Sequence, residues 1–580
     1  MADEQLVVTS SPKKKIGFFS AILIVMGSAI GVGIFLRSKQ VLQASAYNVV
    51  WALIVWLIAG FAVVTMALAL IEVSSGRNDN LGMIGWTKAF NTLYIYKGTK
   101  FFMTYLYLPF TYFFMPYYVI VQFQDGINGF TGADPNFGGT TSAPWIYFAI
   151  GLAITVWMVF SAGLSSRAGN IQNWIITSVK FVPLVAVTII GFVFLAFKVN
   201  GTHGFNETNN VIWHSVQTSD LFNAKSQSFL GLTPFLTVFS ALGGIFFAFD
   251  GFYVTAGMQS EMKDPKKTPA ALVIGLLSMT AIYILIAASM TLGGASKEGL
   301  PQGDFYGFGD LLAANKAGWV FGIINIMISI GILGIVNGFT IWATRWVEDL
   351  VKEGEMFIPV RAYRYMKHSQ TPIVGAIFVL ALSLPFMLIF TLIGSYGYFA
   401  GWGVGDYYGY KIDNLLTFSD LMANWMAVFA FAFICCAILG AIKNRKQHFI
   451  AVVENKHTIW AGYTSVIMIL TVVSFMVLDP FISIGIVVPQ YINGEEGAKD
   501  ALVGHVVTSL LFVLYLIIMF AATPIERMIA KHNKVKYDRI LNGQYCPCEA
   551  PEWCPCRLEL IREKAELNDL VLKGYAEARI

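Results

Sequence analysis

Two short glycine-containing stretches interrupt apolar runs, and the chemistry that they offer is that of exposed backbone groups. The first is GSAIGVGIF at residues 27–35, and the second is ALGGIFFAFDGF at residues 241–252. Glycine lowers helix propensity by about 1 kcal/mol relative to alanine. A released N–H or C=O group inside a bilayer must find a partner, so a broken helix there indicates a protein-lined cavity. The alternative for Gly27 and Gly31 is a small-residue packing face against a neighbouring helix.

Two ionisable side chains also lie inside apolar runs. Asp250 interrupts the second stretch, and Lys180 lies within NWIITSVKFVPLVAV at 173–187. A charge at such a position is costly and suggests function by default. The alternative for Asp250 is a carboxylate fixed in the hydrogen-bond network of a broken helix. The alternative for Lys180 is an ammonium that reaches back to the membrane interface.

Cysteines gather near the end of the chain, in CPCEAPEWCPC at 546–556. Four thiolates can bind one zinc ion tetrahedrally, and the candidate ligands are Cys546, Cys548, Cys554 and Cys556. The C-x-C spacing differs from the common C-x₂-C pair, so a reduced segment without metal is the favoured alternative. No other cofactor is expected.

The elements that would position these groups are membrane helices. Of the 580 residues, 56% are hydrophobic and 13% are charged, which is too apolar for a soluble chain of this length. Spanning about 30 Å of hydrocarbon takes roughly 20 apolar residues. Runs of that kind predict twelve helices, at 16–36, 47–72, 101–124, 144–163, 171–197, 234–258, 270–293, 318–343, 373–396, 420–442, 460–480 and 504–523.

The distribution of positive charge predicts the orientation. With the N-terminus in the cytoplasm, cytoplasmic segments hold 30 of the 39 Lys and Arg residues and outer segments hold 8, the last being Lys180. This bias follows the positive-inside rule. We therefore expect a basic cytoplasmic arm at 1–15, a twelve-helix domain at 16–523 and a cytoplasmic tail at 524–580, in a multi-pass protein of the cell membrane. The net charge of +4 gives no reason to expect nucleic-acid binding.

The two glycine-rich runs are the first and the sixth, and interrupted segments at matching places in two halves indicate the central site of a transporter. The sequence here resembles the amino acid–polyamine–organocation transporters. GSAIGVGIF is similar to the first-helix motif of that family, and FFAFDGF followed by SEMKDPKKTP is similar to its sixth helix and the loop after it. VNGFTIWATRWVEDLVKEGEMFIP at 336–359 resembles the eighth-helix pattern.

The resemblance implies an all-α membrane fold with a five-plus-five inverted repeat of the leucine-transporter type, in which helices 1 and 6 are broken. Backbone N–H groups at a half-helix start attract a carboxylate, and free carbonyls attract an ammonium. Phe249 and Phe252 would form an aromatic lid, or else pack in the core. The expected substrate-binding residues are Ser28, Ala29, Ile30, Gly31, Val32, Gly33, Phe247, Ala248, Phe249, Asp250, Gly251 and Phe252.

The function implied by the resemblance is secondary active transport of amino acids by alternating access. Lys180 would be the proton-coupling group in symport or exchange, so the expected partners are an amino acid, protons and membrane lipid. A polyamine or organic-cation carrier is the alternative within transport. A membrane-embedded enzyme is less favoured because most of the seven histidines lie in loops and no HExxH or GxSxG motif is present. A channel would favour pore-lining carboxylates or a filter loop, and the sequence indicates neither.

Overall fold

The computed structural model describes most of the region in which membrane helices were expected. The longer described stretches are 17–29, 33–77, 81–134, 136–197, 225–253, 267–294, 305–352, 371–399 and 406–526. Shorter pieces lie at 199, 222–223, 263–264, 296–297, 300–301, 355–356, 362, 365–366, 369, 528 and 565. The basic arm at 1–15 and nearly all of the tail, with its four cysteines, lie outside the described residues.

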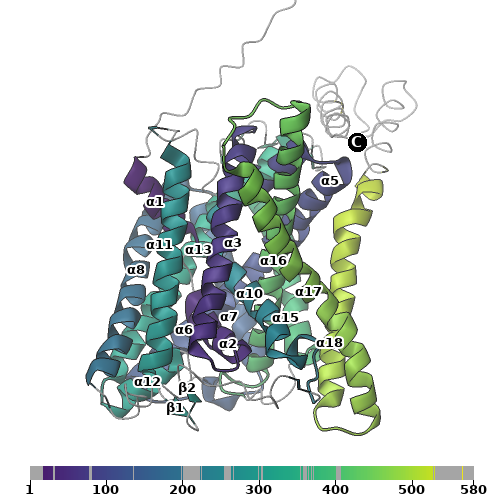
Figure 1. Ribbon diagram of the computed structural model, residues 1–580. Coiled ribbons are helices and arrows are strands. Elements are labelled where there is room, and N and C mark those ends of the chain that lie inside the picture. The colour runs from purple at the N-terminus through teal and green to yellow at the C-terminus, as the bar shows by residue number, and fades with distance from the viewer. Residues whose placement is uncertain are drawn as a thin grey trace, which may run out of the picture.

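The described residues are mainly helical (Figure 1). The α-helices of the first half are α1 (Phe18–Ala29), α2 (Gly33–Ala44), α3 (Val49–Ser75), α4 (Met83–Phe90), α5 (Leu93–Phe102), α6 (Leu108–Thr131), α7 (Ala143–Met158), α8 (Ser166–Phe197) and α10 (Pro234–Phe249). Those of the second half are α11 (Thr268–Gly293), α12 (Phe305–Ala314), α13 (Gly318–Lys352), α15 (Ile373–Leu392), α16 (Ile412–Gln447), α17 (Thr458–Ile492) and α18 (Ala498–Leu516).

Short irregular elements join these helices. Single π-helical turns are η1 (Met103–Tyr107), η3 (Val159–Gly163), η8 (Ile393–Gly397) and η9 (Ile517–Ala521), and 3₁₀ turns are η2 (Phe137–Gly139) and η5 (Leu230–Leu232). The all-α expectation holds apart from one minimal antiparallel pair, β1 (Ser296–Lys297) with β2 (Leu300–Pro301), in which Ser296 faces Pro301.

Nine of the described helical stretches are long and apolar enough to cross a membrane. They coincide with nine of the twelve predicted runs and make the chain a multi-pass membrane protein. The three remaining runs have other forms. The first contains α1 and the start of α2, the third is the irregular series α5–η1–α6, and the sixth contains the short helix α10.

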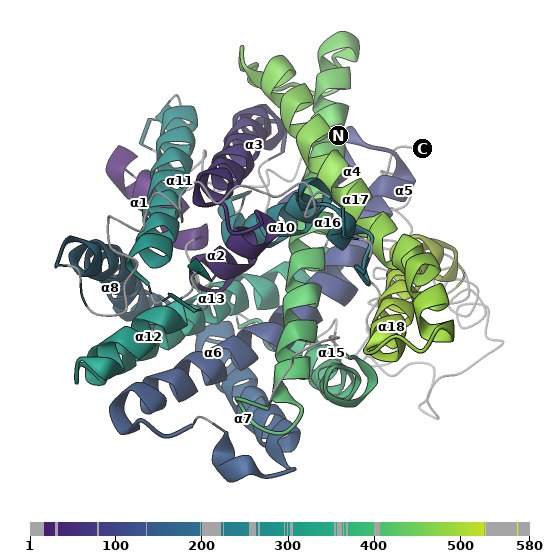
Figure 2. The ribbon, with the colours of Figure 1, turned by 60° about the horizontal axis from the view of Figure 1, so that its bottom comes forward.

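Burial separates a central set of helices from a peripheral set. Within the most apolar 18-residue segment of each helix, 83% of the residues of α16 and 72% of those of α3 are buried. The corresponding shares are 22% for α17 and 28% for α8. Exposed apolar side chains on the peripheral helices, such as Trp174 and Ile467, fit a hydrocarbon surrounding. Figure 2 shows α2 and α10 enclosed by α3, α6, α13 and α16, with α18 at one edge.

The helix starts have local sequence causes. Asn48 precedes α3, and its side-chain oxygen accepts a hydrogen bond from the N–H of Trp51 at 2.8 Å. Thr233 precedes α10 and accepts from the N–H of Leu236 at 3.2 Å. Both are the residue types that satisfy free N–H groups at a helix start. Pro234 follows at the first position of α10, where its missing N–H costs nothing.

Candidate functional site

The first glycine stretch includes the end of one helix and the start of the next. Helix α1 ends at Ala29 and α2 begins at Gly33. Residues 30–32, including the predicted Ile30, Gly31 and Val32, lie outside the described residues. Ser28 and Ala29 belong to the last turn of α1. The described ends therefore place a helix C-terminus and a helix N-terminus within a few residues of each other.

The second stretch contains the end of α10. This helix stops at Phe249, and Asp250 takes an extended conformation with φ −59° and ψ 145°. Gly251 follows with φ +94°, a conformation that side chains with a Cβ rarely adopt. The glycine after Asp250 therefore has a conformational reason, which is the turn that follows α10.

Helices α2 and α10 approach each other through small residues. A Cβ added to Gly33 would lie 2.7 Å from both Cα and Cβ of Ala248, and one added to Gly244 would lie 3.1 Å from Cδ of Arg37. The start of α2 thus lies directly against the end of α10. At Gly33, the lack of a side chain is required by this close approach.

The carbonyl groups at these helix ends are partly occupied. The Phe247 carbonyl accepts from the N–H of Asp250 at 3.1 Å, and the Ala248 carbonyl accepts from the hydroxyl of Tyr283 at 2.9 Å. A carbonyl oxygen has two lone pairs, so each can accept one further hydrogen bond. The structure thus brings Gly33 against the end of α10, which carries Phe247, Ala248 and Asp250.

Asp250 is hydrogen-bonded within the protein. One carboxylate oxygen accepts from the Tyr107 hydroxyl at 2.7 Å, and the other accepts from the N–H of Gly251 at 2.9 Å. The Tyr253 hydroxyl donates to that of Tyr107 at 3.2 Å. Tyr107 ends the π-helical turn η1, which is a feature common at functional sites. The carboxylate therefore has partners without a bound cation, and it ties the turn after α10 to the α5–η1–α6 series.

Lys180 reaches the end of α1. Its ammonium on α8 donates a hydrogen bond to the carbonyl of Gly27, two residues before α1 ends. A Cβ on Gly331 of α13 would lie 3.2 Å from the Lys180 Cβ, so the side chain lies between α1, α8 and α13. A cation at this position interacts favourably with the C-terminal end of a helix. The ammonium thus points to the glycine stretch, whereas snorkelling would turn it to the interface.

The phenylalanines at the end of α10 and in the turn after it divide into two groups. Phe249 and Phe252 are fully buried, with the Phe249 ring 5.2 Å from that of Tyr283 and the Phe252 ring 5.8 Å from that of Phe431. Both rings therefore pack in the core, which was the alternative to an aromatic lid. Phe247 differs from both, because its ring lies 5.3 Å from the Arg37 guanidinium carbon.

A buried ion pair beside Phe247 was missed by the sequence analysis. Arg37 on α2 is fully buried, and its Nη1 lies 2.7 Å from Oδ2 of Asp420 on α16. The hydroxyl of Tyr118 donates to Oδ1 of Asp420 at 2.6 Å. Arg37 lies four residues after the start of α2 and Asp420 eight residues after the start of α16, and α2 lies in the lower part of the bundle in Figure 1. The only sequence signal is an arginine four residues after Gly33, which the predicted span boundaries place in an outer loop.

A second ionic cluster lies toward the opposite end, where α13 ends. The Glu355 carboxylate is 2.7 Å from the Lys88 ammonium and 2.9 Å from that of Lys97, and the Lys100 ammonium is 2.5 Å from Glu526. Burial raises the pKa of Glu355, but the ammonium groups of Lys97, Lys100 and Lys88 outweigh it, so the pKa falls to about 2. The cluster joins α4 and α5 to the segment after α13 and to the end of the α18 stretch.

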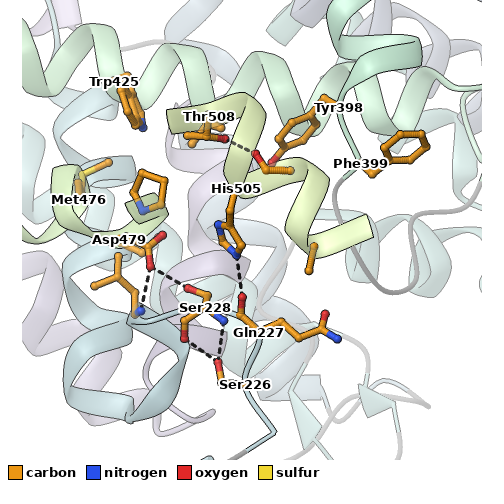
Figure 3. A pocket seen from close by; sticks show the side chains of 16 residues that line it. Ser226, Gln227, Ser228, Tyr398, Phe399, Trp425, Met476, Asp479, His505 and Thr508 are labelled. Carbon is orange, nitrogen blue, oxygen red and sulfur yellow. Dashed lines mark hydrogen bonds between the residues drawn. The ribbon is translucent and has the colours of Figure 1, made fainter. Parts of the chain in front are cut away.

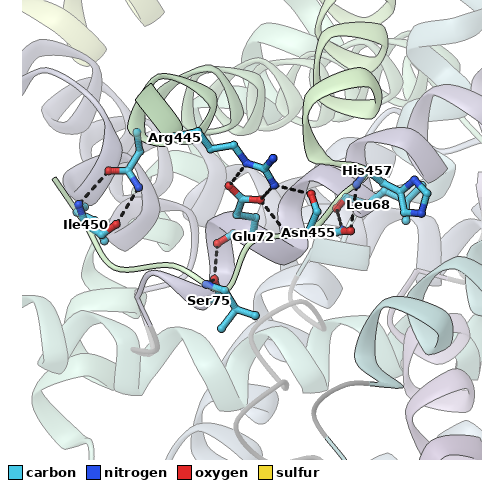
Figure 4. Close-up of polar contacts among 9 residues, drawn as sticks. Leu68, Glu72, Ser75, Arg445, Ile450, Asn455 and His457 are labelled. Carbon is cyan, nitrogen blue, oxygen red and sulfur yellow. Dashed lines mark hydrogen bonds and ion pairs between the residues drawn. The ribbon is translucent and has the colours of Figure 1, made fainter. Parts of the chain in front are cut away.

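A third network fixes the end of α3 to α16 and to the loop before α17 (Figure 4). Nε and Nη2 of Arg445 donate to the two carboxylate oxygens of Glu72 at 2.8 and 2.5 Å. The N–H of Asn455 donates to Glu72 at 3.0 Å, and the Asn455 side chain donates to the Leu68 carbonyl at 3.0 Å. Such a two-point arginine–carboxylate contact is geometrically specific. It holds two ends of the central helix set in a fixed arrangement.

A metal centre does not emerge in the part of the chain that the structure describes. No group of three or more His, Cys, Asp or Glu side chains there could hold an ion. The proposed zinc ligands in the tail fall outside these residues. Cys435 and Cys436 are free thiols on α16, one buried and one partly buried.

Comparison with known proteins identifies the family of the chain. Residues 16–495 match the family described as amino acid permease. An uncharacterized protein of Mycoplasma pneumoniae is 40% identical over 565 residues, covering 92% of this chain and 97% of its own. A serine/threonine exchanger of Bacillus subtilis is 23% identical over 388 residues, covering 65% and 77%. The b(0,+)-type amino acid transporter 1 of Mus musculus is 26% identical over 429 residues, covering 70% and 77%.

The two named relatives are membrane transporters and not enzymes, and the family match covers most of the helical bundle just described. With its paired helix ends, its buried charges and the nine apolar spans among its described residues, this chain belongs to the amino acid permease family.

Proposed function

We propose that this permease is a secondary active carrier that binds an amino acid between the α1–α2 junction and the end of α10. The observation that carries the proposal is the close approach of two helix ends. A Cβ added to Gly33 at the start of α2 would lie 2.7 Å from Ala248 at the end of α10. A helix start attracts an anion and a helix end attracts a cation. An amino acid carries both groups on one carbon.

In this proposal the α-carboxylate binds backbone N–H groups of the stretch 28–33, which leads from the end of α1 to the start of α2. The α-ammonium binds carbonyls at the ends of α1 and α10, where Phe247, Ala248 and Ile30 are the candidates. The second lone pairs of the Phe247 and Ala248 carbonyls remain available beside their present partners. Asp250 acts by positioning the turn after α10 through Tyr107 and Gly251.

Lys180 is proposed as the proton-coupling group. The support is its hydrogen bond to the Gly27 carbonyl, because a charged ammonium there competes for the same helix end as the substrate ammonium. Loss of the Lys180 proton would weaken that contact and change the electrostatic potential at the end of α1. The same positive charge opposes a sodium ion at this position. The proposal therefore expects proton-driven symport or exchange without sodium dependence.

Alternating access is proposed to use the two buried ionic clusters. The Arg37–Asp420 pair closes the path at the lower end of the bundle, and the Lys88–Lys97–Glu355 cluster holds the opposite end together. Each ion pair must separate for the site to open on that side. Separation of a buried pair loses its Coulomb energy, so each pair favours the closed arrangement on its side. The leucine-transporter type of inverted repeat, with helices 1 and 6 broken, belongs to this proposal.

The orientation proposed for the chain has both termini in the cytoplasm of a cell, with lipid surrounding the bundle. The support is the excess of Lys and Arg in the segments on that side. Glu355 and its lysine partners are then cytoplasmic, and the Arg37–Asp420 pair faces outward.

The experiment is uptake of radiolabelled amino acids by the purified protein in liposomes, with proton and sodium gradients imposed separately. Serine and threonine are tested first, because the Bacillus subtilis relative is named as their exchanger. The proposal expects uptake with a proton gradient or with amino acid preloaded inside, and loss of the proton effect in Lys180→Ala. Sodium-driven uptake that is unchanged in Lys180→Ala would refute the coupling assignment.

A polyamine or organic-cation carrier remains the second candidate. The carboxylate of Asp250 near the end of α10 is the observation in its favour. Competition of labelled serine uptake by putrescine, ornithine and leucine separates the two. Inhibition by putrescine alone would favour the organic-cation carrier, whereas inhibition by leucine favours an amino acid carrier.

A further inference from the structure

A cavity of about 340 Å³, shown in Figure 3, is lined by residues other than those of the central site. It is formed by α16, α17, α18, the residues after η8 and the segment that leads into α10. On α10 it reaches Ser240, which is nine residues, or about 13.5 Å of helix, before the end at Phe249. Its volume is in the range of small-molecule pockets.

Asp479 of α17 supplies a positioned carboxylate to this cavity. Its Oδ1 accepts hydrogen bonds from the Ser228 hydroxyl at 2.9 Å, the N–H of Leu230 at 3.0 Å and the Ser483 hydroxyl at 3.1 Å. Among the described residues, Oδ2 has no hydrogen-bond partner. A carboxylate held by one oxygen, with the other unpaired, is arranged to accept from a ligand donor.

An aromatic wall completes the site. Trp425 lines the cavity although only 4% of the residue is exposed, and its ring is fixed edge-on against Phe512 at 5.3 Å and Tyr515 at 6.1 Å. Tyr398 lines the same space. Tryptophan faces attract organic cations more strongly than other aromatic side chains do. The Trp425 indole N–H has no partner within the described part of the chain.

The charges around the cavity favour a cation. Neither lysine nor arginine is among its described lining residues, and Asp479 is the carboxylate. His505 uses Nε2 to donate to the Gln227 carbonyl at 2.7 Å, so that nitrogen does not compete for Asp479. Oδ2 of Asp479 is therefore available to accept a hydrogen bond from a ligand ammonium.

From this arrangement we propose that the cavity binds a small organic ammonium compound with an apolar body. The ammonium donates to Oδ2 of Asp479, and the apolar part lies against Trp425 and Tyr398. The ammonium can come from a soluble amine or from the headgroup of phosphatidylethanolamine. The proposal does not depend on the central amino acid site, because the two sets of lining residues are different.

The test measures binding of 2-phenylethylamine to the full chain in nanodiscs of phosphatidylcholine by titration calorimetry. We expect saturable one-to-one binding, and binding at least about tenfold weaker for 2-phenylethanol, which lacks the charge. Asp479→Asn keeps the Oδ1 acceptor but removes the charge, and it should weaken amine binding by a similar factor. The matched control Asp500→Asn, on the exposed start of α18, should leave it unchanged.

Two further variants separate binding in this cavity from binding at the central site. Trp425→Phe keeps an aromatic ring and should weaken the amine by a few-fold, while Asp250→Asn at the central site should have no effect. Equal binding of amine and alcohol, equal binding to Asp479→Asn and wild type, or loss confined to Asp250→Asn would overturn the proposal. Weaker amine binding in nanodiscs that contain phosphatidylethanolamine would identify the lipid as the source, and unchanged binding would identify a soluble amine.

Discussion

The contact between Gly33 and Ala248 gives a quantitative prediction for substrate affinity. A Cβ at Gly33 would lie 2.7 Å from Cα and Cβ of Ala248, so Gly33→Ala must move α2 away from α10. Overpacking of this kind costs about 1–3 kcal/mol, and 1.4 kcal/mol corresponds to a tenfold change in affinity. If the displaced helix end binds the substrate carboxylate, the serine Kd should rise about 5- to 150-fold.

Matched glycine variants separate this contact from general effects of alanine on a helix. Gly485 of α17 has nothing within 4 Å of an added Cβ, and at Gly27 the nearest atom is Nζ of Lys180 at 3.8 Å. Gly485→Ala should leave serine binding unchanged, and Gly27→Ala should change it little. Adding Ala248→Gly to Gly33→Ala removes one of the two clashing atoms and should restore part of the affinity.

The assay is equilibrium binding of labelled serine to purified protein, with the thermal unfolding midpoint measured on the same samples. Wild-type affinity in Gly33→Ala, with an unchanged unfolding midpoint, would refute the close approach of α2 and α10. A lower midpoint with unchanged affinity would keep the contact but remove its connection to the binding site.

Three other predictions concern the ionic clusters. Asp420→Asn removes the partner of a fully buried arginine and should open the outer path. In Gln40→Cys protein, the cysteine should therefore react faster with a thiol reagent applied from outside when Asp420→Asn is also present. An unchanged reaction rate would argue against a gate. Glu355→Gln leaves three buried ammonium groups near one another and should cost about 3–5 kcal/mol of stability at pH 7. Because the Glu355 pKa is lowered to about 2 from 4.5, its stabilisation is complete above about pH 5 and is lost as the pH falls toward 2. The difference in unfolding midpoint between wild type and Glu355→Gln should therefore narrow at pH 3, and an equal difference at pH 7 and pH 3 would contradict the assignment. Arg445→Lys retains the charge but loses the two-point contact with Glu72 and should lower the midpoint, whereas Lys443→Arg on the same helix should not.

Local sequence predicted nine apolar spans that the structure contains among its described residues, because such spans depend on residue type within a short window. Glycine at 33 and 251 and the carboxylate at 250 indicated irregular backbone, and the structure has a helix start at Gly33 and a turn at Asp250 and Gly251, whereas Gly244 lies inside α10. The structure gives a physical reason for each of the three glycines. Gly33 lies against Ala248, Gly244 lies against Arg37, and Gly251 has a positive φ.

The partners of the charged groups could not be predicted, because they are distant in the chain. Lys180 contacts a carbonyl 153 residues away, and Arg37 contacts a carboxylate 383 residues away. The same holds for the aromatic residues, since the positions of Phe247, Phe249 and Phe252 on α10 and in the turn after it do not determine which ring packs in the core and which contacts Arg37. Only the packing of the helices decides this.

The central claim is that backbone groups at the facing ends of α2 and α10 bind both charges of an amino acid. Competition for labelled serine by serine methyl ester, which lacks the carboxylate, and by N-acetylserine, which lacks the ammonium, tests it most directly. The claim predicts that unlabelled serine competes and that both derivatives are weaker by about 100-fold or more, since each loses a charge-assisted contact. Competition by either derivative as strong as that by serine would contradict it.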